Sequence, residues 1–336
     1  MVGRHKRIWI GVAVTAAVLL AAVGLALTLD RPGEAPRDSG AASADPIASA
    51  IGPTLDPVAS QTPGPIPTKS PSTAPSERAW PNATNTGVPA GWTPASTRTT
   101  DLVVTKAATV IEDVRIVGAS LVINAPNVTV RRVEIQGGSI NNFAGSQCRN
   151  GLVLENVSVV RTAGQKTTDD GFPAIGAGGY TARRVKIDGL SEGFRVGGNS
   201  NGCGEVRIED SFARIVSPDT CGDWHGDGVQ GYGGAKLIIR NVTLELVEKA
   251  GCGGTAPFFY PDKQGNTSVD IDRLLVKGGG YSFRNGMPGP IVNLRVVDRG
   301  WGYGPVDHSG TCPWDARLVT VDSQFRILST GAAIRC

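Results

Sequence analysis

The chain has 336 residues, a formal net charge of +3 and 45 glycines, but only 2 methionines. Beyond the first seven positions its basic residues are scattered, and no basic stripe alternates with aromatic residues. This excludes nucleic acid as a predicted partner. A glycine-rich chain with few long helix-period runs is typical of a β protein with many turns.

Residues 8–29 form the first informative segment, because they are uncharged and mostly apolar. A helix of this length measures ~33 Å, enough to span a hydrocarbon core of ~30 Å. Arg4, Lys6 and Arg7 precede it, so the positive-inside rule places residues 1–7 in the cytoplasm. We therefore predict a transmembrane signal anchor, with the rest of the chain extracellular. The alternative is a cleaved signal peptide, which would give a secreted protein.

Residues 30–79 contain ten of the 22 prolines, together with many Ser, Thr and Ala residues. Such a composition buries too little apolar surface to offset the entropy lost on ordering. We predict a disordered linker here, which holds a folded domain at 80–336 away from the membrane.

The cysteines all lie in the exported part of the chain: Cys148, Cys203, Cys221, Cys252, Cys312 and Cys336. An even number in an oxidising compartment predicts three disulfides. The sequence leaves their pairing open. We favour pairing between sequence neighbours, because neighbouring turns of a solenoid are also neighbours in sequence. This gives the pairs Cys148–Cys203, Cys221–Cys252 and Cys312–Cys336.

A short repeat returns from residue 109 onward, in which alternating aliphatic residues flank a polar pair. Copies lie at 128–135, 152–159, 181–187, 206–212 and 237–244, with a looser one at 269–276. The alternation predicts half-buried strands, and the polar pair predicts a bend between two strands of one coil. The copies recur roughly every 19 to 32 residues, which is the period range of solenoid repeats. With no helical pattern between the copies, we predict an all-β fold, a parallel β-helix over 80–336.

One rung adds a family resemblance. Residues 225–230, HGDGVQ, look like the H-x-D-G-x-Q rung of bacterial secreted proteins, and the domain resembles the pectate-lyase-like right-handed parallel β-helix superfamily. The resemblance implies a right-handed solenoid wound from one chain and activity on polysaccharides. The R-x-P-x-x-R motif of pectate lyases and the R-I-K element of polygalacturonases are absent. Residues 169–170 and 306–308 are similar only to short parts of their motifs.

The first candidate site consists of Asp223, His225 and Asp227, whose spacing would place them on one face of a strand. Burying three ionisable groups costs several kcal/mol each. We therefore expect them to face outward, or the chain to turn at Gly226 or Gly228. The group suits acid–base catalysis or cation binding, and the alternative is a solvated turn.

Three further charged residues are candidates for catalysis. Asp169 and Asp170 lie in a long insertion between repeats, where adjacent carboxylates favour a raised pKa or a bound cation. An ordinary exposed turn is the alternative there. For Arg284, the resemblance implies that an arginine can serve as a base or neutralise a sugar carboxylate, and the alternative is a solvated rung position.

Aromatic side chains supply the predicted sugar-binding surfaces, because their flat apolar faces suit sugar rings. The candidates are Trp224, Trp301, Tyr303 and Trp314. The alternative for Trp301 and Tyr303 is that they cap an end of the β-helix core. For Trp80 and Trp92, just before the first repeat, we favour capping.

These features together predict a polysaccharide-active enzyme at the cell surface, either a lyase or a glycoside hydrolase. The alternative is a non-catalytic β-helix protein that binds glycans or other surface molecules. The expected partners are an extracellular polysaccharide and, through residues 8–29, the membrane, and the expected state is a monomer. No cofactor motif is present in the sequence, and calcium is the cation that we consider for the carboxylates.

Overall fold

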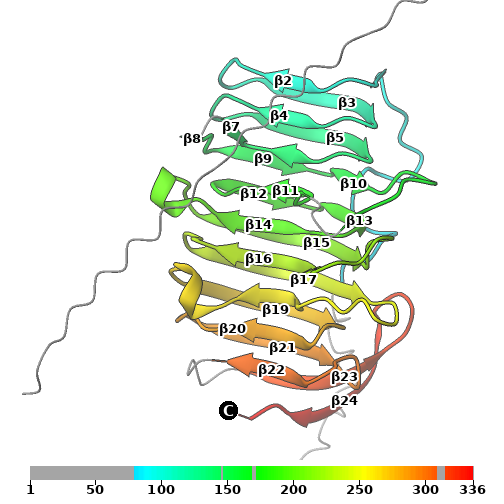
Figure 1. Cartoon of the computed structure of the whole chain (residues 1–336), viewed down its shortest axis with the longest axis vertical. Helices are drawn as coiled ribbons and strands as arrows, with labels where there is room; N and C mark the ends of the chain where they lie inside the picture. The colour runs from blue at the N-terminus through cyan, green and yellow to red at the C-terminus, as the bar shows by residue number, and fades with distance from the viewer. Residues whose placement is uncertain (1–78, 145–146, 169–171, 309–314, 336) are drawn as a thin grey trace, which may run out of the picture. The chain divides into compact units, whose positions relative to one another are not determined.

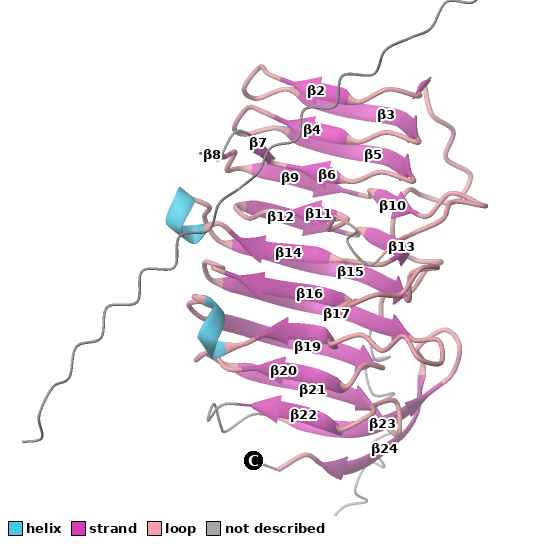
Figure 2. Cartoon of the chain, viewed as in Figure 1, coloured by secondary structure: helices cyan, strands magenta, loops and turns pink. Residues whose placement is uncertain are grey.

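The computed structural model describes residues 79–144, 147–168, 172–308 and 315–335. Within these residues nearly all regular structure is β, with two short 3-10 helices, η1 (Asn199–Asn201) and η2 (Asp262–Gln264) (Figure 2). None of the described helices has the length and apolar character needed to cross a bilayer. The predicted anchor at 8–29, and all of the predicted linker except Ala79, lie outside the described residues.

The strands form two long sheets and one small hairpin. The first sheet contains β1 (Ser96–Arg98), β3 (Val110–Val117), β5 (Thr129–Gln136), β9 (Leu152–Glu155), β10 (Ser158–Val160), β12 (Tyr180–Arg183), β13 (Lys186–Leu190), β15 (Val206–Val216), β17 (Leu237–Val247), β19 (Val269–Lys277), β21 (Ile291–Val297), β23 (Ala316–Val321) and β24 (Ile327–Ala333). The second sheet contains β2 (Leu102–Val104), β4 (Leu121–Ile123), β6 (Ile140–Asn141), β11 (Ile175–Gly176), β14 (Phe194–Gly197), β16 (Asp227–Tyr232), β18 (Ala256–Tyr260), β20 (Tyr281–Asn285) and β22 (Gly304–His308). The hairpin joins β7 (Phe143–Ala144) to β8 (Gln147–Cys148).

Both long sheets are parallel, apart from the antiparallel pair β23 and β24. The chain passes back and forth between the sheets, so that β14, β15, β16 and β17 belong to the second, first, second and first sheet in turn. Each strand pairs with the strand of the next coil, as β15 does with β17 (Figure 1). This confirms the predicted all-β class, and the stacked parallel sheets fit the predicted β-helix.

The predicted bend at the polar pair is confirmed. In each copy the second residue of the pair has a left-handed backbone, with φ between 49° and 67°. These residues are Arg132, Asn156, Arg184, Asp210, Asn241 and Arg273. A left-handed residue other than glycine costs roughly 1–2 kcal/mol. Hydrogen bonds between coils offset this cost, such as Arg184 Nε to Asn156 Oδ1 at 2.7 Å and Asn241 Nδ2 to Asp210 Oδ1 at 2.7 Å.

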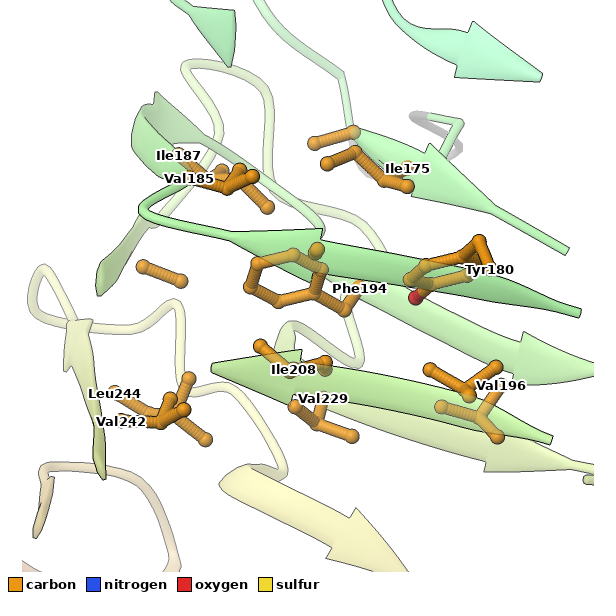
Figure 3. Packing of buried hydrophobic residues seen from close by; sticks show 14 of the residues in the cluster. Ile175, Tyr180, Val185, Ile187, Phe194, Val196, Ile208, Val229, Val242 and Leu244 are labelled. Carbon is orange, nitrogen blue, oxygen red and sulfur yellow. The ribbon is translucent and has the colours of Figure 1, made fainter. Parts of the chain in front are cut away.

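The core fills the space between the two sheets. Phe194, Val229 and Ile208 are at most 1% exposed and meet Leu244 in the interior (Figure 3). Phe258 and Phe283 lie on successive strands of the second sheet and stack with ring centroids 4.7 Å apart. Because side chains alternate along a strand, the neighbours of these buried residues point outward.

Residues 80–92 run alongside the first sheet and cross several coils, and we call this segment the strap (Figure 1, cyan). The Trp80 ring is 4% exposed and packs in a cluster with Phe212 and Phe325. At the other end of the strap, Trp92 Nε1 donates to Asp113 Oδ1 at 3.0 Å. The expectation that both tryptophans cap the first coil is wrong, because Trp80 packs far from that coil.

Two of the predicted disulfides are confirmed, Cys148–Cys203 and Cys221–Cys252. Each joins segments that approach one another because their coils are stacked. The third predicted pair, Cys312 with Cys336, lies outside the described residues.

Candidate active site

The outer face of the second sheet carries a row of functional side chains. The strand register aligns Arg195 with Gln230, Gln230 with Phe259, and Phe259 with Arg284. Their sequence neighbours Phe194, Val229, Phe258 and Phe283 are buried in the core. The row Arg195–Gln230–Phe259–Arg284 therefore faces outward, one residue per coil.

Two carboxyl groups lie on the first two coils of this row, where strands β14 and β16 begin. Glu192 lies two residues before Phe194, and Asp227 lies two residues before Val229. Phe194 and Val229 pair in the sheet. Glu192 is 7% exposed and Asp227 is 0% exposed. Positions paired in this way on neighbouring strands lie ~4.8 Å apart. The structure thus holds two nearly buried carboxyl groups on successive coils.

Hydrogen bonds fix the position of Asp227. Its Oδ1 accepts from the backbone N–H of Ala256 at 3.1 Å, and its Oδ2 accepts from Gln230 Nε2 at 2.9 Å. The backbone N–H of Gly193, next to Glu192, donates to the carbonyl oxygen of Asp227 at 2.9 Å. These bonds connect three consecutive coils around the carboxyl pair.

Burial shifts the titration of both carboxyl groups upward. Burial raises the pKa of Glu192 to about 8, although the positive charge of Arg195 and a hydrogen bond from the Asp227 backbone act in the opposite direction. Burial and, after it, the charge of Glu192 raise the pKa of Asp227 well above its usual value. The pair therefore holds at least one proton at neutral pH. This is the condition for one carboxyl group to act as an acid.

A cavity of about 510 Å³ opens beside Asp227, whereas Glu192 does not line it. We call it the carboxyl cavity, and its boundary includes Arg195, His225, Asp227, Gln230, Phe259 and Arg284. Three buried polar atoms that belong to its lining, Arg195 Nε, Gln230 Oε1 and Gln264 Oε1, have no hydrogen-bond partner among the described residues. Buried polar atoms without a partner cost free energy unless a ligand or water satisfies them. The cavity therefore suits a ligand rich in hydroxyl groups.

The predicted trio of Asp223, His225 and Asp227 does not share a strand face. Strand β16 begins at Asp227, so the break falls at Gly226, one of the two turn positions considered from the sequence. Asp223 and His225 precede the strand on an exposed loop, where Asp223 Oδ1 lies 3.2 Å from His225 Nε2. His225 still joins Asp227 in the lining of the carboxyl cavity.

Arg284 lines the carboxyl cavity, and its catalytic role stays a prediction. Its Nε is 2.8 Å from Asp307 Oδ2, and its guanidinium carbon lies 5.3 Å from the centre of the Phe259 ring. Asp169 and Asp170 lie outside the described residues. In the described part of the chain, no group of three or more His, Cys, Asp or Glu side chains is placed to hold a metal ion.

The predicted sugar-binding aromatic residues do not gather at the cavity. The role given to Trp224 is wrong, because its ring is 4% exposed and its indole N–H donates to the Ser191 carbonyl oxygen at 3.0 Å. Trp301 packs against the core, while Tyr303 is 83% exposed, and its ring lies 5.8 Å from that of Tyr281. Neither lines the carboxyl cavity. Trp314 lies outside the described residues.

The Cys221–Cys252 disulfide supports the rim of the carboxyl cavity. It joins the loop before β16, which carries His225, to the loop before β18, which carries Thr255. The hydroxyl of Thr255 lies 3.4 Å from His225 Nδ1. The cross-link therefore limits the movement of the exposed histidine relative to the buried carboxyl pair.

The sequence around Glu192 matches the sequence around Asp227. Residues 192–196, EGFRV, and 227–231, DGVQG, share an acid–glycine–apolar–polar order. Both glycines are needed for close packing, because a Cβ on Gly193 would lie 2.1 Å from the Gly228 carbonyl oxygen.

Comparison of the chain with protein-family models, with curated proteins and with solved structures finds no match.

Proposed function

We propose that this chain is a polysaccharide-active enzyme of the cell surface, and that Glu192 and Asp227 are its acid–base pair. One observation carries the proposal: two carboxyl groups on successive coils are buried with raised pKa values, and one of them, Asp227, lines a cavity whose polar atoms include several without a partner among the described residues. A buried carboxyl pair held beside an open cavity is the arrangement that acid–base catalysis requires.

Glycoside hydrolysis is the reaction that this pair fits best. The protonated carboxyl group donates its proton to the leaving sugar oxygen as the glycosidic bond breaks. The ionised partner attacks the anomeric carbon, and water then releases the sugar and restores the proton. Backbones of stacked coils are ~4.8 Å apart, so the two side chains can approach to the ~5–5.5 Å that separates the carboxyl groups of retaining enzymes. The alternative enzyme is a lyase, because Arg195 supplies a cation beside the pair that could neutralise a sugar carboxylate.

Membership of the pectate-lyase-like superfamily and attachment to the cell surface belong to the same proposal. The long parallel sheets and the buried pair just before β14 and β16 of the second sheet support the first. The uncharged segment at 8–29 and the proline-rich residues that follow it support the second.

Non-catalytic glycan binding is the competing hypothesis, and one observation favours it. Both side-chain oxygens of Asp227 accept hydrogen bonds from the protein, and the residue is 0% exposed. Such hydrogen bonds are also those of an aspartate whose sole role is to position neighbouring coils. Substrate binding would then use Arg195 and Gln230 without a chemical step.

The test is to incubate the full-length chain with a panel of neutral and acidic polysaccharides. New reducing ends indicate cleavage, and a rise in ultraviolet absorbance from unsaturated uronates indicates elimination. On any substrate that is cleaved, Glu192→Gln and Asp227→Asn should each lower the rate roughly 100-fold or more. Glu245→Gln is the matched control, because Glu245 is also nearly buried but pairs with Lys277 on the first sheet. Unchanged rates in both site variants, with the fold intact by circular dichroism, would favour the binding hypothesis.

A further inference from the structure

A second cavity of about 520 Å³ lies on the same outer face, toward the N-terminal coils. Its floor follows one row of the sheet, from Val122 through Asn141 and Gly176. Arg195 continues this row on the next strand, because Ile175 pairs with Phe194. Arg195 also lines the carboxyl cavity, so the two cavities meet at its side chain.

Apolar side chains form most of the surface of this second cavity, which we call the apolar cavity. They are Val122, Ile140, Phe143, Phe172, Pro173 and Ala177. Its volume falls within the range of ~300–1,000 Å³ typical of sites for small organic groups.

Apart from Arg195, the polar side chains of the apolar cavity already hydrogen-bond within the protein. Asp101 Oδ1 accepts from the Ser120 backbone N–H at 2.8 Å, and the Ser120 and Ser139 hydroxyls lie 3.3 Å apart. Asn141 Oδ1 accepts from the Phe143 backbone N–H at 2.8 Å. The carboxyl cavity differs, because Gln230 Oε1 and Gln264 Oε1 have no partner there among the described residues. A sugar ring rich in hydroxyls fits the carboxyl cavity, whereas an apolar group fits the apolar cavity.

The charges at the junction of the two cavities indicate which kind of ligand group would bind there. Arg195 is the one cation in the described lining of the apolar cavity, and its Nε has no hydrogen-bond partner among the residues that the structure describes. Arg284, the other arginine of the carboxyl cavity, already pairs with Asp307. An occupant that spans both cavities is therefore expected to carry one anionic group, placed at Arg195, and few others.

We propose that the apolar cavity is a subsite for an acyl or aryl ester substituent on an acidic polysaccharide, and that Arg195 binds a carboxylate of the same polysaccharide. The inference rests on the proposed function, since it places the sugar that reacts in the carboxyl cavity. It goes further by naming the substrate as an esterified acidic glycan rather than an unsubstituted polyuronate, which would need a cation for each sugar.

The test is affinity electrophoresis of the full-length chain carrying Asp227→Asn, which separates binding from turnover. The probes are feruloylated and acetylated beet pectin, acetylated xanthan and high-acyl gellan, each paired with its saponified form. At least one esterified form should retard the protein at a concentration roughly 10-fold lower than its saponified partner does. This follows from burying ~60 Å² of apolar surface at ~25 cal/mol per Å².

Three added substitutions assign the preference to this cavity. Val122→Asn should abolish the difference between esterified and saponified forms, whereas Val292→Asn, a partly exposed valine of the first sheet, should keep it. Arg195→Gln should weaken the binding of both forms, and Arg195→Lys should restore most of it.

Equal retardation by each esterified and saponified pair would overturn the inference, as would no retardation by any esterified probe. A preference that survives Val122→Asn would also overturn it. An ester preference that depends on Val122, in a protein whose parent cleaves none of the probes, would support the subsite and count against the enzyme. Circular dichroism of each variant verifies that the fold is intact.

Discussion

Replacement of Glu192 by glutamine should stabilise the folded protein at neutral and alkaline pH. The side chain is nearly buried, and burial raises its pKa from 4.5 to about 8. A carboxyl group with a raised pKa in the folded state contributes stability below its unfolded pKa, and this contribution is lost as the pH rises through the folded pKa. A difference of about 3.5 pKa units at ~1.4 kcal/mol per unit corresponds to ~5 kcal/mol lost between pH ~4.5 and ~8.

Guanidinium unfolding of parent and variant, followed by circular dichroism at intervals from pH 5 to pH 8, measures this loss. The free energy of unfolding of the parent should fall steeply with pH, and that of Glu192→Gln should fall less. The unfolding free energy of the variant should still fall somewhat with pH, because the pKa of Asp227 is also raised. Glu205→Gln, at an exposed position, is the control. If Glu192→Gln leaves the slope of the parent unchanged, then Glu192 ionises in the fold as easily as in water, and its role as an acid is refuted.

Three other predictions follow from the same structure. Activity on a cleavable glycan should decrease as the pH rises above about 8, where Glu192 loses its proton, and a rate that stays constant to higher pH would exclude Glu192 as the acid. Removing the Cys221–Cys252 disulfide by serine substitution at both positions should lower the free energy of unfolding by ~2–4 kcal/mol, and an unchanged denaturation midpoint would show that the loops hold without it. Trp80→Ala should cost ~3–5 kcal/mol by the same measurement, because the buried ring packs the strap against Phe212 and Phe325, whereas a cost below ~1 kcal/mol would mean that the strap is not anchored there.

The architecture was predictable because it repeats. Every copy of the strand pattern carries a polar pair whose second residue adopts the left-handed conformation, as Arg132 and Asn241 do. A single copy would read as an ordinary strand, but a bend at the same place in six copies predicts stacked coils. The repeat says nothing about the strap, because the packing of Trp80 against Phe212 and Phe325 depends on where a nonrepetitive segment crosses the coils.

The candidate site was only partly predictable, because its members come from different coils. Asp227 was identified from the motif that contains it. Its partner Glu192 lies 35 positions earlier, a distance set by the loops of the intervening coil and not by any local spacing. The alternation from Asp223 to Asp227 suggested a strand, but the loop bends so that the Trp224 ring turns inward. A Cβ on Gly226 would lie 2.0 Å from that ring, so the glycine makes room for the tryptophan that had been expected to bind sugar.

The energetic cost of the carboxyl pair supports a functional role for it. Two adjacent carboxyl groups that are nearly buried destabilise the fold at neutral pH, whereas amides at the same positions would keep most hydrogen bonds without the cost of ionisation. A purely structural role for Asp227, as an acceptor for Ala256 N–H and Gln230, gives no reason for a second acid on the adjacent coil. Glu192 adds the cost of burying a second ionisable group. The pair is therefore better explained by proton transfer to a ligand in the carboxyl cavity than by the stability of the coils.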